Sequence, residues 1–137
     1  MIVQKTISIQ TKGRGCIEIT SKVASFLSES RIDTGLCNIF IQHSSAALII
    51  CENADPSVLT DLETFTSNLV PDGAPMFMHT AEGPDDMPAH VRSVFTHSSL
   101  TIPIISAELG LGTWQGIFLW EHRLKRHHRN LVLSIWY

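Results

Sequence analysis

Apolar residues in this chain come in short runs that either alternate with polar residues or stop within a few positions. Ile2–Gln10 alternates, with Ile7 and Ile9 between polar neighbours, and the longest purely apolar stretch, Ala46–Cys51, covers only six residues. Such lengths are typical of β-strands and are far below the roughly 20 residues of a membrane-spanning helix. The sequence therefore predicts a β-rich domain that does not cross a membrane.

Eight segments are predicted to be strands because their apolar runs are bounded by turn-forming residues. They are Ile2–Gln10, Gly15–Thr20, Leu36–Gln42, Ala46–Cys51, Met76–Thr80, Ser99–Ile105, Trp114–Glu121 and Leu131–Trp136. A short glycine-containing turn separates the first two of these segments, so we expect them to pair as a hairpin.

Three helices are predicted from apolar residues at helical spacing. The first covers about Lys22–Ser30, with Thr20 or Ser21 as its N-cap. The second follows Asp55 as N-cap and Pro56 at the first helical position, with apolar residues at Val58, Leu62, Phe65 and Leu69. The third begins near Met87, and Val91, Val94 and Phe95 are expected to face inward.

The order of these elements predicts the fold class. Strands pair locally, helices come singly, and no regular alternation of strand and helix emerges. The chain has 137 residues and contains no repeat, low-complexity tract or linker. We therefore expect one domain over residues 1–137, an α+β fold with two packed, mainly antiparallel sheets in a β-sandwich-like arrangement and about three helices.

Charge and cysteine content restrict the kinds of partner and the cellular compartment that we expect for this chain. The formal net charge is −3 and the pI is near 6.1, so the chain has no polybasic field for nucleic acid or an anionic membrane. Its three cysteines are an odd number at wide spacings, which favours reduced thiols. The N-terminal strand also lacks the features of a signal peptide. These observations predict a cytoplasmic protein that binds small molecules.

Three histidines could ligate a metal. His43 ends a strand, His79 lies on a short strand candidate, and His90 lies near the start of the third helix. Three imidazoles are a ligand set that an open catalytic zinc site can use. Carboxylates would instead suit Mg²⁺ held with a substrate's phosphates, and the sequence leaves both ions open. His43 could also be a core histidine satisfied by a backbone carbonyl.

Acidic residues are concentrated at the predicted start of the third helix. Asp86 and His90 are four residues apart and therefore lie on one face, with Asp85 beside the free backbone N–H groups of the first turn. One aspartate would be explained as an N-cap, but two acids with a histidine on the same face exceed what capping needs. We therefore expect Asp85, Asp86 and His90 to be catalytic residues.

A second group of polar residues lies near the next strand ends. Asp55 is best explained as a helix cap, whereas Glu52 ends a buried strand and is expected to point into a cleft as a catalytic residue. Candidate substrate-binding residues, which supply polar groups or an aromatic surface at element ends, are Ser44, Asn53, Trp114, Gln115 and Arg123. A tryptophan in this position is more often a core residue than a ligand-binding one.

These polar segments together resemble the YjbQ-like family, also described as secondary thiamine-phosphate synthases. The matching stretches are His43–Ala46, Glu52–Pro56, Glu82–His90, Gly112–Ile117 and Glu121–Arg123, in order and at similar spacing from about Gln4 to Leu131. Two departures stand out: Ser44 replaces the usual threonine, and the loop Leu124–His128 is bulkier and more basic than the expected glycine-rich version.

The resemblance implies a β-sandwich-like α+β fold that assembles as a homotrimer, with polar pockets between subunits. It also implies weak thiamine-phosphate synthase activity, in which a pyrimidine pyrophosphate is joined to a thiazole phosphate and pyrophosphate leaves. We expect a divalent metal, zinc or magnesium, to be held by His43, His79 and His90 or by nearby carboxylates. A metal-dependent hydrolase of a small phosphorylated substrate and a non-enzymatic trimeric binder of a small anion are the alternatives.

Overall fold

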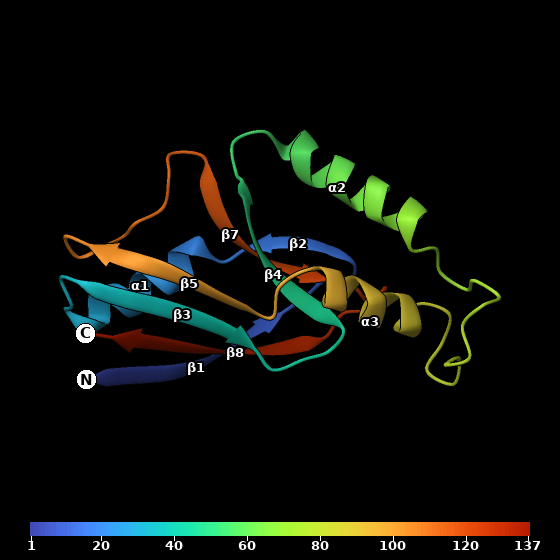
Figure 1. Ribbon diagram of the computed structural model, residues 1–137, viewed down its shortest axis with the longest axis horizontal. Coiled ribbons are helices and arrows are strands. Elements are labelled where there is room, and N and C mark those ends of the chain that lie inside the picture. Colours follow the sequence, from blue (N-terminus) through green and yellow to red (C-terminus); the bar gives the residue numbers. More distant parts are fainter.

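The computed structural model describes all residues from Met1 to Tyr137 and contains two antiparallel sheets and three helices. The strands are β1 (Ile2–Gln10), β2 (Gly15–Glu18), β3 (Gly35–Ile41), β4 (Ala46–Glu52), β5 (Ser99–Ile105), β6 (Glu108–Leu109), β7 (Gln115–Glu121) and β8 (His128–Trp136). The helices are α1 (Thr20–Ser30), α2 (Pro56–Leu69) and α3 (Asp86–Phe95). The predicted α+β fold with two mainly antiparallel sheets is confirmed (Figure 1).

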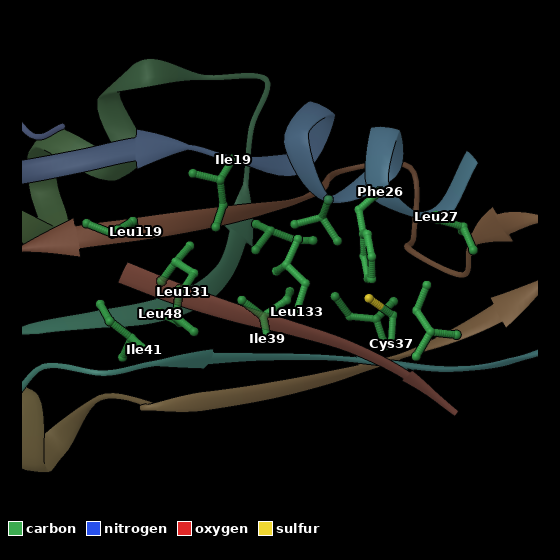
Figure 2. Close-up of a cluster of buried hydrophobic side chains, with 14 of the residues drawn as sticks. Ile19, Phe26, Leu27, Cys37, Ile39, Ile41, Leu48, Leu119, Leu131 and Leu133 are labelled. Atoms are coloured by element: carbon green, nitrogen blue, oxygen red, sulfur yellow. The ribbon is translucent and has the colours of Figure 1, made fainter. Parts of the chain in front are cut away.

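The larger sheet has five strands in the order β1-β8-β3-β5-β6, and the smaller has three in the order β2-β7-β4. Apolar side chains from both sheets and from α1 fill the space between them, including Ile39, Leu133, Leu48 and Leu119 (Figure 2). Phe26 of α1 belongs to the same core. Strand alternation is the cause, because successive side chains point to opposite faces and only one face of each sheet is covered by the other.

Two predictions about strands are wrong. The first two strands do not form a hairpin, because β1 pairs with β8 while β2 pairs with β7 in the other sheet. Met76–Thr80 is not a strand; it lies in the loop before α3, and Met76 and Met78 are exposed. The short strand β6 was not anticipated, since two residues give no pattern of alternation.

The N-terminal boundaries of the helices agree with the predictions to different degrees. Asp55 caps α2 as expected, since its Oδ1 accepts a hydrogen bond from the Ser57 N–H at 2.9 Å. The predicted cap of α1 is wrong: the N-cap residue is Ile19, and the Thr20 hydroxyl instead bridges Glu18 and the Ile117 N–H. A hydroxyl at a helix start is therefore used here to join α1 to β7.

Several large apolar residues of helices α2 and α3 are exposed. No residue of α2 is buried, and Phe65 and Leu69 are 66% and 63% exposed. In α3, Val94 and Phe95 are exposed, contrary to prediction, whereas Asp86 and Arg92 are buried. The inner faces of both helices are occupied by a polar network, because Glu63 of α2 accepts hydrogen bonds from Arg92 of α3 and from the Trp120 indole.

No helix of the structure combines the length and the apolar character that crossing a membrane would require. The two ends of the chain lie side by side at one edge of the larger sheet (Figure 1), where the Met1 ammonium donates to the Tyr137 carbonyl at 2.6 Å.

Candidate functional site

The site begins where α3 begins. Asp86 is the first residue of the helix, His90 lies one turn later, and His79 comes from the preceding loop. Asp86 Oδ2 lies 2.7 Å from His79 Nε2 and 3.2 Å from His90 Nε2. One ligand atom from each of the three residues lies within 4.8 Å of the others. The predicted shared face of Asp86 and His90 is therefore formed, and the loop adds His79 to it.

His90 has its tautomer fixed by the backbone. Its Nδ1 lies 3.0 Å from the Ser44 carbonyl oxygen. A carbonyl can only accept, so Nδ1 must carry the hydrogen. In a neutral ring Nε2 is then unprotonated and faces a carboxylate oxygen, which is repulsive. The contact is favourable only if the ring is an imidazolium or if a cation lies between Nε2 and Asp86. A backbone carbonyl on the distal nitrogen is the arrangement that metal-ligating histidines use.

Arg123 holds both aspartates from the other side. Its Nε donates to Asp85 Oδ2 at 2.9 Å and its Nη1 to Asp86 Oδ1 at 2.7 Å, while Nη2 donates to the Glu82 carbonyl. Burial by itself raises the pKa of Asp86, but the hydrogen bond from His79 and the charge of Arg123 outweigh burial and leave this pKa below its usual range. Asp86 is therefore an ionised ligand or orienting group rather than a proton donor.

Asp85 has the same balance. Burial raises its pKa, but the hydrogen bonds from Arg123 and from the Leu124 N–H outweigh burial and leave the pKa lowered. No side-chain hydrogen bond of Asp85 caps α3. Its carboxylate instead fixes the loop that follows β7, which brings Arg123 to Asp86.

His43 does not join this cluster. Its Nε2 accepts from the Asn130 N–H at 2.8 Å, and its Nδ1 lies 3.4 Å from Arg129 Nη1. Burial and the charge of Arg129 lower the pKa of His43. The expected set of three imidazoles is thus not assembled within the chain, because the ring of His43 is engaged by β8 and Asp86 takes the third place beside His79 and His90.

Ser44 contributes to the site through its backbone carbonyl, which orients His90. Beside it lies a buried ion pair that the sequence did not reveal. Glu121 is fully buried and accepts from Arg129 Nε at 2.8 Å, from the Thr11 hydroxyl at 2.8 Å and from the Arg123 N–H at 3.2 Å. One feature of the sequence could have indicated this ion pair: Glu121 ends the apolar strand β7 on the same inward face as Ile117 and Leu119.

Ser44 and Arg123 of the second predicted group lie beside the cluster, but Glu52, Asn53, Trp114 and Gln115 lie at the other end of the smaller sheet. Glu52 and Gln115 are register partners at the far ends of β4 and β7, whereas Ala46 pairs with Glu121 at the near end. Six residue steps of a strand separate the ends by about 20 Å. Asn53 donates to Glu18 and Trp114 is 62% exposed. Within one chain, these residues do not share a cavity with His79, Asp86 and His90.

The polar groups at this far end are engaged locally. Glu52 accepts from the Asp55 N–H at 3.3 Å, so it supports the start of α2. Gln115 Oε1 accepts from the Gly112 N–H at 2.8 Å. Gly116 is required here, because a Cβ atom would come within 2.8 Å of Glu18 Oε2 and 2.9 Å of the Asn53 Cβ. We refer to Glu52, Asn53, Trp114 and Gln115 as the far group.

A cavity of about 420 Å³ opens beside the cluster, between the loop after α2 and the start of α3. Its lining residues are Gly73, Ala74, Pro75, Phe77, His79, Thr80, Gly83, Pro84 and Met87. His79 therefore belongs both to the cavity and to the cluster. This volume lies within the range of ordinary small-molecule sites.

Two buried groups near the site have unpartnered atoms. The His122 ring is fully buried against Trp120, with ring centroids 5.2 Å apart, and neither of its nitrogens has a hydrogen-bond partner. Arg92 Nε is also without a partner, although the same guanidinium binds Glu63 and Ser67. Burial and nearby arginines lower the pKa of His122 to about 3, so the ring is neutral in the folded protein.

Two imidazole nitrogens and one carboxylate oxygen form a donor set that suits a divalent metal such as zinc or iron better than magnesium, which prefers oxygen. Loading the site requires the His79 and His90 nitrogens facing Asp86 to be unprotonated. The Ser44 carbonyl already favours that tautomer of His90.

Comparison with known proteins identifies the family. The family model described as UPF0047 protein YjbQ-like matches residues 5–137. The chain is 48% identical to UPF0047 protein sll1880 of Synechocystis sp., over 96% of this chain and 90% of that protein. It is 40% identical to UPF0047 protein YjbQ of Salmonella typhimurium, over 98% of each.

Solved structures agree with these matches. A YjbQ/UPF0047 family protein from Clostridium acetobutylicum superposes with a TM-score of 0.89 at 31% identity, covering 96% of this chain and 99% of that one. A conserved hypothetical protein from Thermus thermophilus gives a TM-score of 0.83 at 32% identity, covering 93% and 97%. The chain therefore belongs to the YjbQ-like UPF0047 family.

Proposed function

We propose that this protein is a divalent-metal-dependent enzyme that acts on a small phosphorylated substrate, and that its reaction is a weak thiamine-phosphate synthase reaction. The observation that carries the proposal is the pairing of His90 with Asp86. With Nδ1–H committed to the Ser44 carbonyl, Nε2 presents a lone pair toward an ionised carboxylate and His79. This geometry supports a cation held by His79, Asp86 and His90.

The surrounding residues support the roles expected of such a site. Arg123 keeps Asp86 ionised and oriented through the 2.7 Å contact with Oδ1, so Oδ2 stays directed at the two histidines. Asp85 holds Arg123 in place. The chemistry that a bound divalent ion supplies is neutralisation of charge on a departing pyrophosphate. The cavity that His79 lines offers space for the organic part of the substrate.

Catalysis by this scheme also uses the far group, and we propose that a homotrimer provides it. The resemblance noted for the sequence implies polar pockets between subunits. The far group lies at the end of the smaller sheet that is about 20 Å along the strands from the end beside the cluster, so another protomer would have to bring Trp114 and Gln115 to the cluster. The exposure of Trp114, Phe65 and Leu69 supports an assembly, because it leaves apolar surface for a partner to cover.

The proposal is tested by replacing His90 and measuring turnover of the pyrimidine pyrophosphate with the thiazole phosphate in the presence of Zn²⁺ or Mg²⁺. His90→Ala is expected to lower the rate at least 100-fold while leaving the circular dichroism spectrum unchanged, because the side chain is partly exposed and lies outside the apolar core. His97→Ala is the matched control, since that exposed histidine lies outside the cluster, and it is expected to keep the wild-type rate.

Equal rates for the wild type and His90→Ala would remove the cluster from the mechanism. Phosphate release from a simple phosphate ester, with no second organic substrate, would assign a hydrolase to the same residues. Saturable binding of the phosphorylated compounds with no turnover by the wild type would contradict an enzymatic role and favour a binding protein.

A further inference from the structure

Positive charge without a partner gathers on one rim of the molecule. Of the ten Lys and Arg residues, five make ion pairs: Lys5, Arg14, Arg92, Arg123 and Arg129. Three of the five others lie on two adjoining segments, Lys12 in the turn after β1 and Lys125 and Arg126 in the loop before β8. The nearby carboxylate of Glu121 is fully buried and already bound to Arg129. This rim is therefore cationic although the whole chain carries a charge of −3.

An open surface pocket of about 430 Å³ lies between these segments and is lined by Gln10, Thr11, Lys12 and Arg126. No acidic or apolar side chain lines it. An ammonium group, a guanidinium fork and a side-chain amide can all donate hydrogen bonds, and together they suit an oxyanion such as phosphate. We call these four residues the basic pocket.

The walls of the basic pocket are fixed to each other. The Thr11 N–H donates to the His127 carbonyl at 2.8 Å, and the His127 N–H donates back to the Thr11 hydroxyl at 2.9 Å. Gly13, at φ +109°, packs so closely on the loop that an added Cβ would come within 2.5 Å of the Leu124 carbonyl oxygen. Lys12 and Arg126 therefore extend from a rigid frame, which lowers the entropy lost when an anion is bound.

We propose that the basic pocket binds the phosphate group of a small phosphorylated molecule. None of its residues belongs to the metal cluster, so the proposal does not depend on the function proposed above. The two places are nevertheless connected, because Thr11 donates to Glu121, Glu121 accepts from the Arg123 N–H, and Arg123 holds Asp86. The bound phosphate either belongs to a substrate that reaches this rim or to a separate effector.

The test is calorimetric titration of the full chain, in chelator and at constant ionic strength, with inorganic phosphate and with glycerol 3-phosphate. The wild type is expected to bind one anion per chain, and Lys12→Gln combined with Arg126→Gln is expected to weaken binding at least tenfold. Lys22→Gln combined with Arg31→Gln is the matched control, because it removes two unpaired cations elsewhere and should leave affinity unchanged.

Two outcomes of the titration would overturn the proposal. Unchanged affinity in the Lys12/Arg126 variant would show that the anion binds elsewhere. An equal loss of affinity in the control variant would show that binding reflects only the general positive charge of the chain.

A second measurement on the wild type does not depend on any variant. Phosphate should shift the amide NMR signals of Gln10–Lys12 and Arg126. Shifts confined to His79 and His90 would place the anion at the metal cluster and contradict the proposal.

Enzyme kinetics distinguish the two sources of the phosphate. If the phosphate belongs to a substrate, the Lys12/Arg126 variant raises KM without changing kcat. If it belongs to an effector, the variant loses binding while KM stays unchanged.

Discussion

Buried polar residues in this protein are of two kinds, with and without hydrogen-bond partners, and the two differ in the charge they keep on folding. Asp86 is buried but has a partner at each oxygen, with Arg123 on Oδ1 and the two histidines on Oδ2. His122 is equally buried and has no partner for either ring nitrogen. A paired carboxylate keeps its charge on folding, whereas an unpaired imidazole surrounded by arginines can only be neutral.

His122 makes stability fall with acid. Its pKa is about 3 in the folded protein, against an ordinary value of 6.5, so the unfolded chain binds an extra proton between these limits. The stabilising contribution is present above pH 6.5 and is lost as the pH falls through that window, by about 2.5 kcal/mol between pH 7 and pH 4.5.

We expect His122→Phe to remove much of this dependence, because phenyl cannot be protonated and still packs on Trp120. Urea unfolding at pH 7 and pH 4.5 measures the difference, and His97→Phe at an exposed site is the control. A wild type and a His122→Phe variant that lose the same stability between the two pH values would show that His122 is not the responsible group.

At the scale of elements, the turn between β1 and β2 links the two sheets. It takes the chain from β1, paired with β8, to β2, paired with β7. Alternating residues predicted both strands correctly, but pairing of neighbours was the wrong assumption because β1 finds β8 more than a hundred residues away. The glycine read as a hairpin signal is needed instead for close contact between the turn and the Leu124 carbonyl.

A comparison of Gly13 in this turn with Gly15 at the start of β2 separates backbone strain from steric contact. Gly13 and Gly15 both have positive φ, at +109° and +138°, but only Gly13 has an atom where a Cβ would stand. Gly13→Ala should therefore lower the free energy of unfolding by about 2 kcal/mol more than Gly15→Ala does. Both variants strain a residue at positive φ, but only the alanine at position 13 also clashes with a neighbouring atom. Chemical denaturation of the two variants measures this. Equal losses would indicate that the turn moves away from Leu124 freely.

Helices were the elements whose faces the sequence predicted least well. The spacing in α3 predicts an inward face for Val94 and Phe95, yet both are exposed, and Phe65 at helical spacing in α2 is exposed too. The inner surface is instead joined by Glu63, Arg92 and Trp120 through hydrogen bonds. Spacing identifies a common face, but it does not say whether the core of the same chain or a partner covers that face.

At the scale of the molecule, the fold class, the sheets and the membership of the family all followed from the sequence. The candidate site could be predicted from the sequence only in part. The four-residue spacing of Asp86 and His90 fixed their common face, whereas the convergence of His79 depends on a loop without periodicity. His43 failed to join because the backbone of β8, 87 residues away, occupies its ring nitrogen.

The proposed homotrimer explains why α2 buries nothing within its own chain. We expect light scattering after gel filtration to give three times the chain mass of 15.2 kDa. Phe65→Glu should reduce that mass by placing a charge on the apolar face of α2, and Thr60→Glu on another side of the same helix should not. A wild type that runs as a monomer at micromolar concentration would contradict the assembly and leave the far group without a route to the cluster.

The most direct test of the account is metal content. Protein purified without a histidine tag and dialysed against Zn²⁺ should retain one ion per chain by elemental analysis, and His79→Ala and His90→Ala should each lower that content to background, while His97→Ala retains it. No stably bound ion in the wild type, or full retention after His90 is replaced, would contradict the proposal that His79, Asp86 and His90 form a divalent metal site.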